Sequence, residues 1–353
     1  MESRASVGVD RHLSPRIAYW LTSFDPELEA VAKEVATLHA RFPGSFLWGV
    51  SEHCSLRLSR RRGWGFSPRL HLLFRALTAV LQRRYDVNHI FGGLGDWHHL
   101  RAIRKGPTVL TMALDAEPVG MELLRKVDRF VVEWPDAKIR LHELGVDDAK
   151  IDLIYPPVDL ERFGPRPCPD GEFTVVFASS PDRASWMEAR GVDVVIGAAQ
   201  RRPDMKFVLC WRPWGDSQPR VRRMVEDAGV DNVEVRVGRV VDMAELYSEA
   251  HVTVLVARET VRAKPLPNSL VESCACGRPV VTSSTCGLAP LLTETDAGKV
   301  IEADADQLAA ALDDLRDDWD GYAERARRLA EMAFDENQFV ENYRRVYEAV
   351  LTG

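Results

Sequence analysis

The sequence predicts an α/β protein in which two doubly wound domains face a cleft. Its 353 residues are too many for one ordinary domain and suit two. Short apolar segments alternate with amphipathic ones, and this alternation occurs twice along the chain. Between the two runs, residues 164–171 hold three prolines and two glycines, a composition typical of a linker. Such runs form parallel sheets whose ligands bind beyond the carboxyl ends of the strands.

The first run opens with an apolar segment at residues 16–21, which predicts a strand. Residues 27–42 are expected to form a helix, because apolar residues recur at helical spacing from Leu28 to Leu38. The further strands are expected at 45–50, 87–91, 108–113 and 129–133, and the further helices at 70–82 and 137–144.

The second run repeats the pattern after the linker. The helix expected at 269–276 has a capping residue, Asn268, before it and Gly277 after it. Two helices, at 305–316 and 319–350, are expected to close the chain. The other strands are expected at 173–178, 206–211, 233–237, 252–256 and 279–282, and the other helices at 192–200, 219–228 and 243–248.

Composition excludes several classes of protein. With 46% hydrophobic and 28% charged residues, the chain resembles ordinary globular proteins rather than disordered or collagen-like ones. No apolar run reaches the roughly 18 residues of a membrane span, and the charged residues 1–16 do not read as a signal peptide. The net charge of −7 argues against a dedicated nucleic-acid binder. The six cysteines form no CxxC pair, so we expect no metal site and a reduced, cytosolic chain.

One segment carries a specific motif. Residues 264–281 read Lys-Pro-Leu-Pro-Asn-Ser-Leu-Val-Glu-Ser-Cys-Ala-Cys-Gly-Arg-Pro-Val-Val, and this resembles the donor-site motif of the GT-B glycosyltransferases of family 4. Residues 127–163, the Arg-Gly-Val-Asp at 190–193 and residues 335–351 resemble other parts of that family. The resemblance implies transfer of a sugar from a nucleotide-sugar to an acceptor hydroxyl, with retention at the anomeric carbon and no required metal.

The same resemblance, together with the linker, divides the chain. We expect an N-terminal acceptor domain over residues 1–163 and a nucleotide-sugar domain over residues 172–336, joined by the linker at 164–171. Residues 337–353 are expected to form a helix that returns to the first domain.

A nucleotide-sugar needs ligands for its ribose, its diphosphate and its base. A helix carboxylate can accept hydrogen bonds from two ribose hydroxyls, and a helix N-terminus with nearby cations suits a diphosphate. Arg190 stands where the family has a lysine and keeps the positive charge. The Gly-Arg that the family has after the first strand of this domain is absent here. Arg183 is either a substitute for that arginine or a solvated surface residue, and Arg212 is a weaker candidate for the same role. The expected ribose ligand is Glu272. The expected diphosphate ligands are Asn268, Ser269, Leu270, Arg190 and Arg183. The base is expected to lie beside Arg239 and Val240.

The expected catalytic residues depart from the family pattern. Lys264 occupies the position of a glutamate that faces the transferred sugar in the family. It is open to four interpretations: a partner for an anionic sugar such as a uronic acid, a diphosphate ligand, a sign of a damaged active site, or a solvated loop residue. The family's histidine after the strand at 108–113 is absent too. Asp115 and Glu117 lie just beyond its place, and His98 lies, with His89 and His99, in or after the preceding strand. A carboxylate beside an acceptor hydroxyl can serve as its base.

A basic stretch in the first domain bears on the acceptor. Eight arginines and no acidic residue lie between Ser55 and Tyr85, interleaved with Trp64 and Phe66. This pattern suits an anionic membrane surface, and hence a lipid-linked acceptor at the inner membrane face. An anionic soluble acceptor, or an ordinary helix packed on the sheet, are the other interpretations.

The sequence therefore predicts a cytoplasmic hexosyltransferase with a UDP- or GDP-linked donor and no further cofactor. Two alternatives stay open. One is a catalytically degenerate GT-B protein that serves as a partner or scaffold. The other is a nucleotide-sugar enzyme with non-transfer chemistry, such as epimerisation or hydrolysis.

Overall fold

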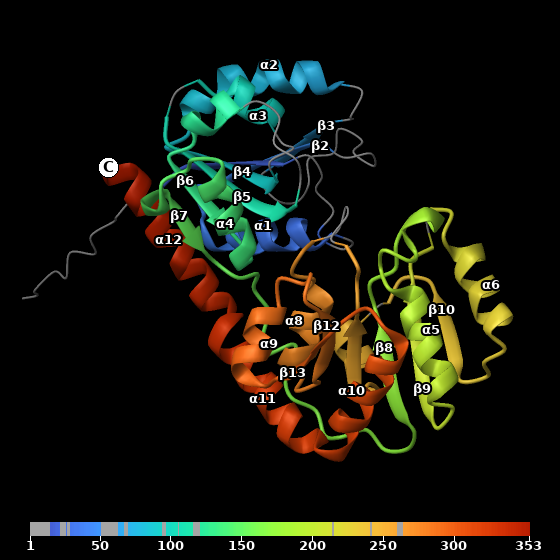
Figure 1. The fold of residues 1–353 in the computed structure, drawn as a ribbon. Coiled ribbons are helices and arrows are strands. Elements are labelled where there is room, and N and C mark those ends of the chain that lie inside the picture. Colours follow the sequence, from blue (N-terminus) through green and yellow to red (C-terminus); the bar gives the residue numbers. More distant parts are fainter. Residues whose placement is uncertain are drawn as a thin grey trace, which may run out of the picture.

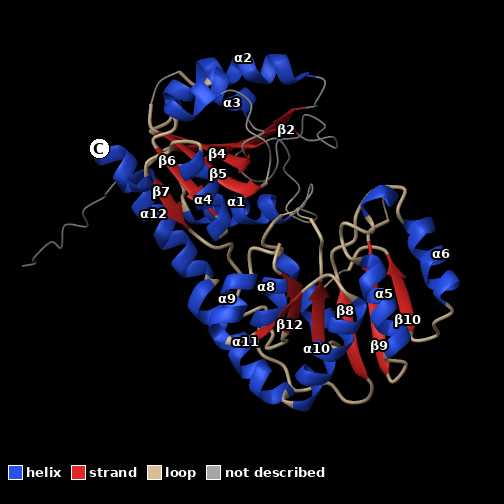
Figure 2. Cartoon of the chain, viewed as in Figure 1, coloured by secondary structure: helices blue, strands red, loops and turns tan. Residues whose placement is uncertain are grey.

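Two parallel sheets, each covered by helices on both faces, make up the protein in this computed structural model (Figures 1 and 2). This arrangement confirms the expected fold class. No helix in the described ranges is long and apolar enough to cross a membrane. The structure describes residues 15–21, 26, 29–50, 63–66, 70–93, 97–104, 106–115, 121–213, 215–240, 242–259 and 264–353.

The first sheet has seven strands in the order β3-β2-β1-β4-β5-β6-β7, and all neighbouring pairs are parallel. Its strands are β1 (Ile17–Leu21), β2 (Phe46–Val50), β3 (Gly63–Phe66), β4 (Val87–Gly93), β5 (Thr108–Leu114), β6 (Arg129–Val132) and β7 (Ile151–Leu153). Its helices are α1 (Ala30–Arg41), α2 (His71–Leu81), α3 (Trp97–Ala102) and α4 (Pro135–Glu143).

Both faces of the first sheet are buried, which explains why its strands are apolar throughout rather than alternating. In β1, Ala18 and Trp20 pack toward α2, α3 and α4, whereas Tyr19 and Leu21 pack toward α1. The interpretation of α2 as an ordinary helix packed on the sheet accounts for only part of its apolar side. Leu77 packs against the core, but the side chains of Leu70, Leu72, Leu73 and Val80 are exposed.

The second sheet has six parallel strands in the order β10-β9-β8-β11-β12-β13. Its strands are β8 (Phe173–Phe177), β9 (Met205–Trp211), β10 (Val233–Val237), β11 (Val252–Leu255), β12 (Val280–Ser283) and β13 (Gly298–Ile301). Its helices are α5 (Val192–Arg201), α6 (Gln218–Ala228), α7 (Met243–Ser248), α8 (Asn268–Ala275), α9 (Ala289–Thr295), α10 (Ala305–Asp317) and α11 (Trp319–Ala333).

The chain ends in α12 (Glu336–Thr352), which crosses back to the first sheet, as expected (Figure 1). The expectation of one continuous helix over residues 319–350 is wrong, because α11 and α12 are separated at Phe334 and Asp335. The Asp335 carboxylate caps α12 by accepting a hydrogen bond from the Gln338 backbone N–H over 2.9 Å. The Phe334 carbonyl accepts from the Val158 backbone N–H over 2.8 Å, so the two crossings between domains run side by side.

The strand order places the expected binding site. β1 lies between β2 and β4, and β8 lies between β9 and β11, so each sheet reverses its winding direction at its first strand. Ligands of doubly wound sheets bind beyond the carboxyl ends of the strands at these reversal points. Leu21 ends β1 and Ala178 follows β8, and both line one cavity between the two domains.

Candidate active site

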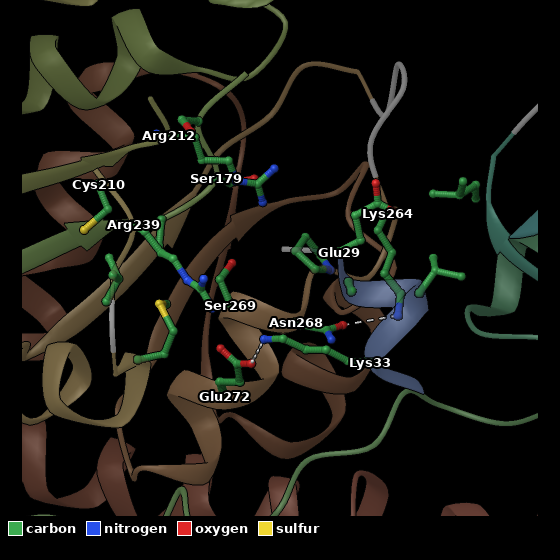
Figure 3. Close-up of a pocket in the computed structure, with 18 of the residues that line it drawn as sticks. Glu29, Lys33, Ser179, Cys210, Arg212, Arg239, Lys264, Asn268, Ser269 and Glu272 are labelled. Carbon is green, nitrogen blue, oxygen red and sulfur yellow. Dashed lines mark hydrogen bonds and ion pairs between the residues drawn. The ribbon is translucent and has the colours of Figure 1, made fainter. Parts of the chain in front are cut away.

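A cavity of about 540 Å³ lies between the domains and draws its lining from both of them. From the first domain come the start of α1, at residues 29–33, and the ends of β1, β4 and β5. From the second come the loops after β8, β9 and β10, the start of α7 and the first turns of α8. Figure 3 shows the charged side chains of these elements pointing toward a common space.

Glu272 lies one turn into α8 and points into this cavity, although its side chain is only 8% exposed. Its Oε1 accepts a hydrogen bond from Lys33 Nζ over 3.3 Å, and its Oε2 accepts one from the Tyr247 hydroxyl over 3.4 Å. Burial raises the pKa of Glu272 above its ordinary value. A buried carboxylate of this kind gains much from two further donors, such as a pair of vicinal hydroxyls.

The N-terminus of α8 opens onto the same cavity through Asn268 and Ser269. The expectation that Asn268 caps this helix is wrong. Pro267 occupies the N-cap position and offers no side-chain hydrogen bond, while Asn268 Oδ1 accepts from Lys264 Nζ over 3.2 Å. The first backbone N–H groups of α8 therefore stay available to an anion. Leu270 does not line the cavity, because its side chain is fully buried in the core beneath the helix.

Arg190 lies in the cavity wall just before α5. Gly191, which follows it, has a φ of 70°, and a Cβ there would collide with the Val256 carbonyl oxygen, so the turn that presents Arg190 needs glycine. Arg190 Nη1 donates to Ser179 Oγ over 3.0 Å, whereas its buried Nε has no hydrogen-bond partner among the described residues. Burial, with a contribution from the nearby Arg212 guanidinium, lowers the pKa of Arg190 to about 10. Two guanidinium groups this close suit a multiply charged anion.

Of the other candidate arginines, two line the cavity and one does not. Arg212 and Arg239 line the cavity, and so does Val240. The backbone turns after β10 at Gly238, whose φ is 139°. Arg183 does not line the cavity, since its guanidinium stacks 5.0 Å from the centre of the Trp186 ring. The charge that Arg183 was expected to supply is available from Arg212 instead.

Lys264 lines the cavity but is not a solvated loop residue, so that interpretation is wrong. Its side chain is only 7% exposed, and its ammonium pairs with Glu34 of α1 and, over 2.8 Å, with Glu133, which follows β6. Burial and the neighbouring Glu34 raise the pKa of Glu133 well above its ordinary value. Although burial alone would lower it, the two carboxylates raise the pKa of Lys264. An anionic sugar would have to displace these carboxylates to reach Lys264.

Comparisons with known proteins agree with this geometry. Residues 173–318, which hold the whole second sheet, match the family model described as glycosyl transferases group 1. A structure of Anabaena HepE in complex with UDP and glucose has a TM-score of 0.76 at 15% identity, covering 95% of this chain and 99% of that one. Sucrose-phosphate synthase from Thermosynechococcus elongatus has a TM-score of 0.76 at 16% identity, covering 96% and 99%.

The second domain thus matches the glycosyl transferases group 1 model, and the chain as a whole has the GT-B fold. Among curated relatives, D-inositol 3-phosphate glycosyltransferase of Mycobacterium marinum is 25% identical over 216 residues. That match covers 55% of this chain and 43% of the relative, so the chain aligns with less than half the length of the curated relatives.

Of the two acceptor-side candidates, Asp115 is not among the residues that line the cavity. Asp115 directly follows β5, next to the lining residue Leu114, and its carboxylate pairs with Arg140 of α4. His98 belongs to the first turn of α3, and its side chain lies outside the described part of the structure. His89, in the strand before it, is buried and hydrogen-bonded within the core. Within the described ranges, no three His, Cys, Asp or Glu side chains gather as a metal site would require.

Sequence reasoning missed the contribution of α1. Glu29, Ala30, Val31 and Lys33 line the cavity, and Lys33 contacts Glu272 directly. The apolar spacing of this helix located the face that packs on the first sheet, but it carried no information about the opposite domain. The one available signal was position, because α1 directly follows the first strand, where doubly wound sheets bind ligands.

Proposed function

We propose that the protein transfers a sugar from a nucleoside-diphosphate donor to an acceptor hydroxyl. The observation that carries this proposal is the alignment of three features in one cavity. These are a buried carboxylate at Glu272, the uncapped start of α8 one turn away, and a buried guanidinium N–H of Arg190 without a partner among the described residues. Together they suit a ribose followed by a diphosphate.

The chemistry that these groups support is stabilisation of the leaving group. When the bond between the anomeric carbon and the diphosphate breaks, negative charge grows on the phosphate oxygens. The Arg190 guanidinium, with Arg212 beside it, and the backbone N–H groups at Asn268 and Ser269 line the cavity where that charge would form. Retention at the anomeric carbon remains part of the proposal through the family resemblance.

The donor is proposed to be a UDP-linked sugar, and a GDP-linked sugar is the alternative. The similar HepE structures hold UDP, UDP with glucose, or UDP-glucose. The sugar itself is proposed to be neutral, because the cation of Lys264 is already matched by Glu34 and Glu133.

The test is a thermal-shift screen with UDP, GDP, ADP and TDP, followed by the sugars of whichever nucleotide stabilises the protein. A ligand that binds only the folded state raises the unfolding midpoint. Transfer to an acceptor then separates the proposal from its two rivals. A degenerate scaffold would bind without turnover, and an epimerase or hydrolase would consume the donor without an acceptor.

The acceptor is proposed to be lipid-linked, and α2 supplies the observation. Its outer side chains Leu72, Leu73 and Val80 are 67%, 51% and 68% exposed. Exposed arginines, at positions 75, 83 and 84, lie on or just after the same helix, and Figure 1 shows this helix on the outer side of the first domain. Exposed leucines beside arginines suit an anionic bilayer. The rest of the basic stretch, at residues 51–62 and 67–69, lies outside the described residues.

Vesicle binding tests the acceptor proposal. The wild-type protein should bind vesicles of anionic lipid at low salt and ignore neutral ones, and replacing Leu72, Leu73 and Val80 with serine should remove the binding. If the wild-type protein ignores anionic vesicles, an anionic soluble acceptor is favoured. That outcome would fit the curated relatives that are named for D-inositol 3-phosphate.

A further inference from the structure

A lysine of the first domain occupies the carboxylate that a ribose would need. Lys33 extends from α1 across the cavity, and its ammonium donates to Glu272 Oε1 over 3.3 Å (Figure 3). Its side chain is 43% exposed, whereas that of Glu272 is 8% exposed. Without this ammonium, the carboxylate would keep the hydrogen bond from the Tyr247 hydroxyl but would carry its charge in a poorly solvated place.

We propose that Lys33 is a donor-binding residue that exchanges partners: it neutralises Glu272 in the empty site and moves to the diphosphate when the ribose takes Glu272. The inference rests on the proposed function and extends it to the first domain. It assigns to α1 a ligand for a donor that the second domain otherwise holds.

The exchange is within reach of a lysine side chain. Glu272 and Asn268 are four residues apart on α8, which corresponds to about 6 Å along a helix. Lys33 therefore needs to swing by about one helical turn to pass from the ribose position to the diphosphate position. Its side chain is 43% exposed, which leaves room to rotate, and Asn268, Ser269 and Arg190 line the same cavity.

The charges of the site favour this movement. Once ribose hydroxyls donate to Glu272, the Lys33 ammonium loses its carboxylate partner. A diphosphate bound at the start of α8 then presents the nearest new anion. Lys33 is the one lysine or arginine that the first domain contributes to the cavity among the described residues. Its capture would connect α1 to the bound donor.

A nucleoside and a nucleoside diphosphate should respond differently to the loss of Lys33. A nucleoside without phosphates must displace Lys33 from Glu272 and offers it nothing in return. A nucleoside diphosphate displaces the same ammonium but supplies a new partner. Removing the charge at position 33 should therefore affect the two ligands in opposite directions, which a purely structural role of Lys33 would not do.

The experiment is calorimetric titration of uridine and of UDP into the wild-type protein, Lys33→Met, Lys33→Arg and the control Lys150→Met. Lys150 is an exposed lysine of the first domain outside the cavity. We expect Lys33→Met to bind uridine about threefold more tightly, because the lysine no longer competes for the Glu272 carboxylate. We expect it to bind UDP about tenfold more weakly, because a charge-assisted contact is lost. Lys33→Arg should keep most of the UDP affinity, and Lys150→Met should match the wild type.

Two results would overturn the inference, and they are distinguishable from failure of the proposed function. If Lys33→Met weakens both ligands, or strengthens both, the exchange does not occur. If it changes neither, Lys33 is only a surface partner of Glu272. If the wild-type protein binds no nucleotide in the preceding screen, the proposed function itself fails, and the inference fails with it.

Discussion

Two sets of ion pairs cross the cleft beside α1 and the start of α8, yet in opposite directions. In one, the cation Lys33 comes from α1 and the carboxylate Glu272 from α8. In the other, the cation Lys264 comes from the loop before α8, and the carboxylates are Glu34 of α1 and Glu133. The first cation is 43% exposed and the second 7%.

This difference in burial separates an exchangeable contact from a permanent one. An exposed ammonium can leave its partner for water or for a ligand at little cost. A buried one cannot leave without stranding charges in a poorly solvated interior. Lys33 and Glu34 are neighbours in sequence on α1, so the buried cluster holds the helix in place while the adjacent lysine stays able to move.

The largest effect is expected from breaking the buried cluster. Lys264→Met would leave Glu34 and Glu133 together without a cation, and removing one partner of a buried ion pair costs about 3–5 kcal/mol. The free energy of unfolding, from denaturant titration, should fall by that amount. In the control Lys138→Met, which breaks an exposed pair with Asp148, the loss should be about 0–1 kcal/mol.

The same cluster offers a rescue. Combining Lys264→Met with Glu34→Gln and Glu133→Gln removes the ammonium together with both carboxyl groups, and stability should return toward the wild-type value. If Lys264→Met alone were as stable as the control, the cluster would not anchor α1. The contrast between the two sets of ion pairs would then disappear.

Much of this molecule could be predicted from its sequence because local patterns encode it. Apolar runs gave the long strands, and the motif at residues 264–281 gave the fold family and the helix that carries Glu272. The short elements β3, α3, β7, α9 and β13, of three to seven residues, were not predicted. Windows this short hold too few turns or alternations for a period to appear.

The contacts across the cleft could not be predicted, and the reason is physical. Glu34 and Glu133 look like ordinary polar residues of a helix and of a strand end, and Lys264 looks like a loop lysine. Their burial results from how two separate sheets face each other. Hydrophobic periodicity reports only how each element packs on its own sheet. It therefore could not predict that Lys33 contacts Glu272, or that Asn268 bonds to Lys264 instead of capping α8.

The second largest effect concerns the exchangeable side of the comparison. Glu272→Ala should weaken nucleotide binding by about 1.5–3 kcal/mol, because a hydrogen bond to a charged group is lost. The measurement is titration calorimetry with the nucleotide that the thermal screen selects. Glu245→Ala, in the first turn of α7 and outside the cavity lining, provides a control. Unchanged affinity in a folded Glu272→Ala protein would remove Glu272 from the site.

A smaller effect should appear in the dependence of stability on pH. Because burial and Glu34 raise the pKa of Glu133, the folded protein holds a proton that the unfolded chain releases above about pH 4.3. Stability therefore falls as pH rises from there toward the folded pKa, by at most about 1.4 kcal/mol per pH unit for one proton. Glu133→Gln should flatten this slope, whereas Glu143→Gln, on the exposed side of α4, should not. An unchanged slope in Glu133→Gln would mean that Glu133 is ionised in the folded protein.

The smallest effect should come from the exposed pair itself in the absence of nucleotide. Lys33→Met removes a cation whose side chain is 43% exposed, and burial already favours the neutral form of Glu272 by raising its pKa, so the free energy of unfolding should change by only about 1 kcal/mol. The difference between Lys33→Met and the wild type should shrink further in 1 M salt, where the Debye length is about 3 Å, because the exposed pair is already screened. The loss in Lys264→Met should persist at the same salt concentration, since water and ions do not reach a cluster this buried. A large, salt-independent loss in Lys33→Met would mean that both sets of ion pairs hold the domains together, and that Lys33 is not free to follow a ligand.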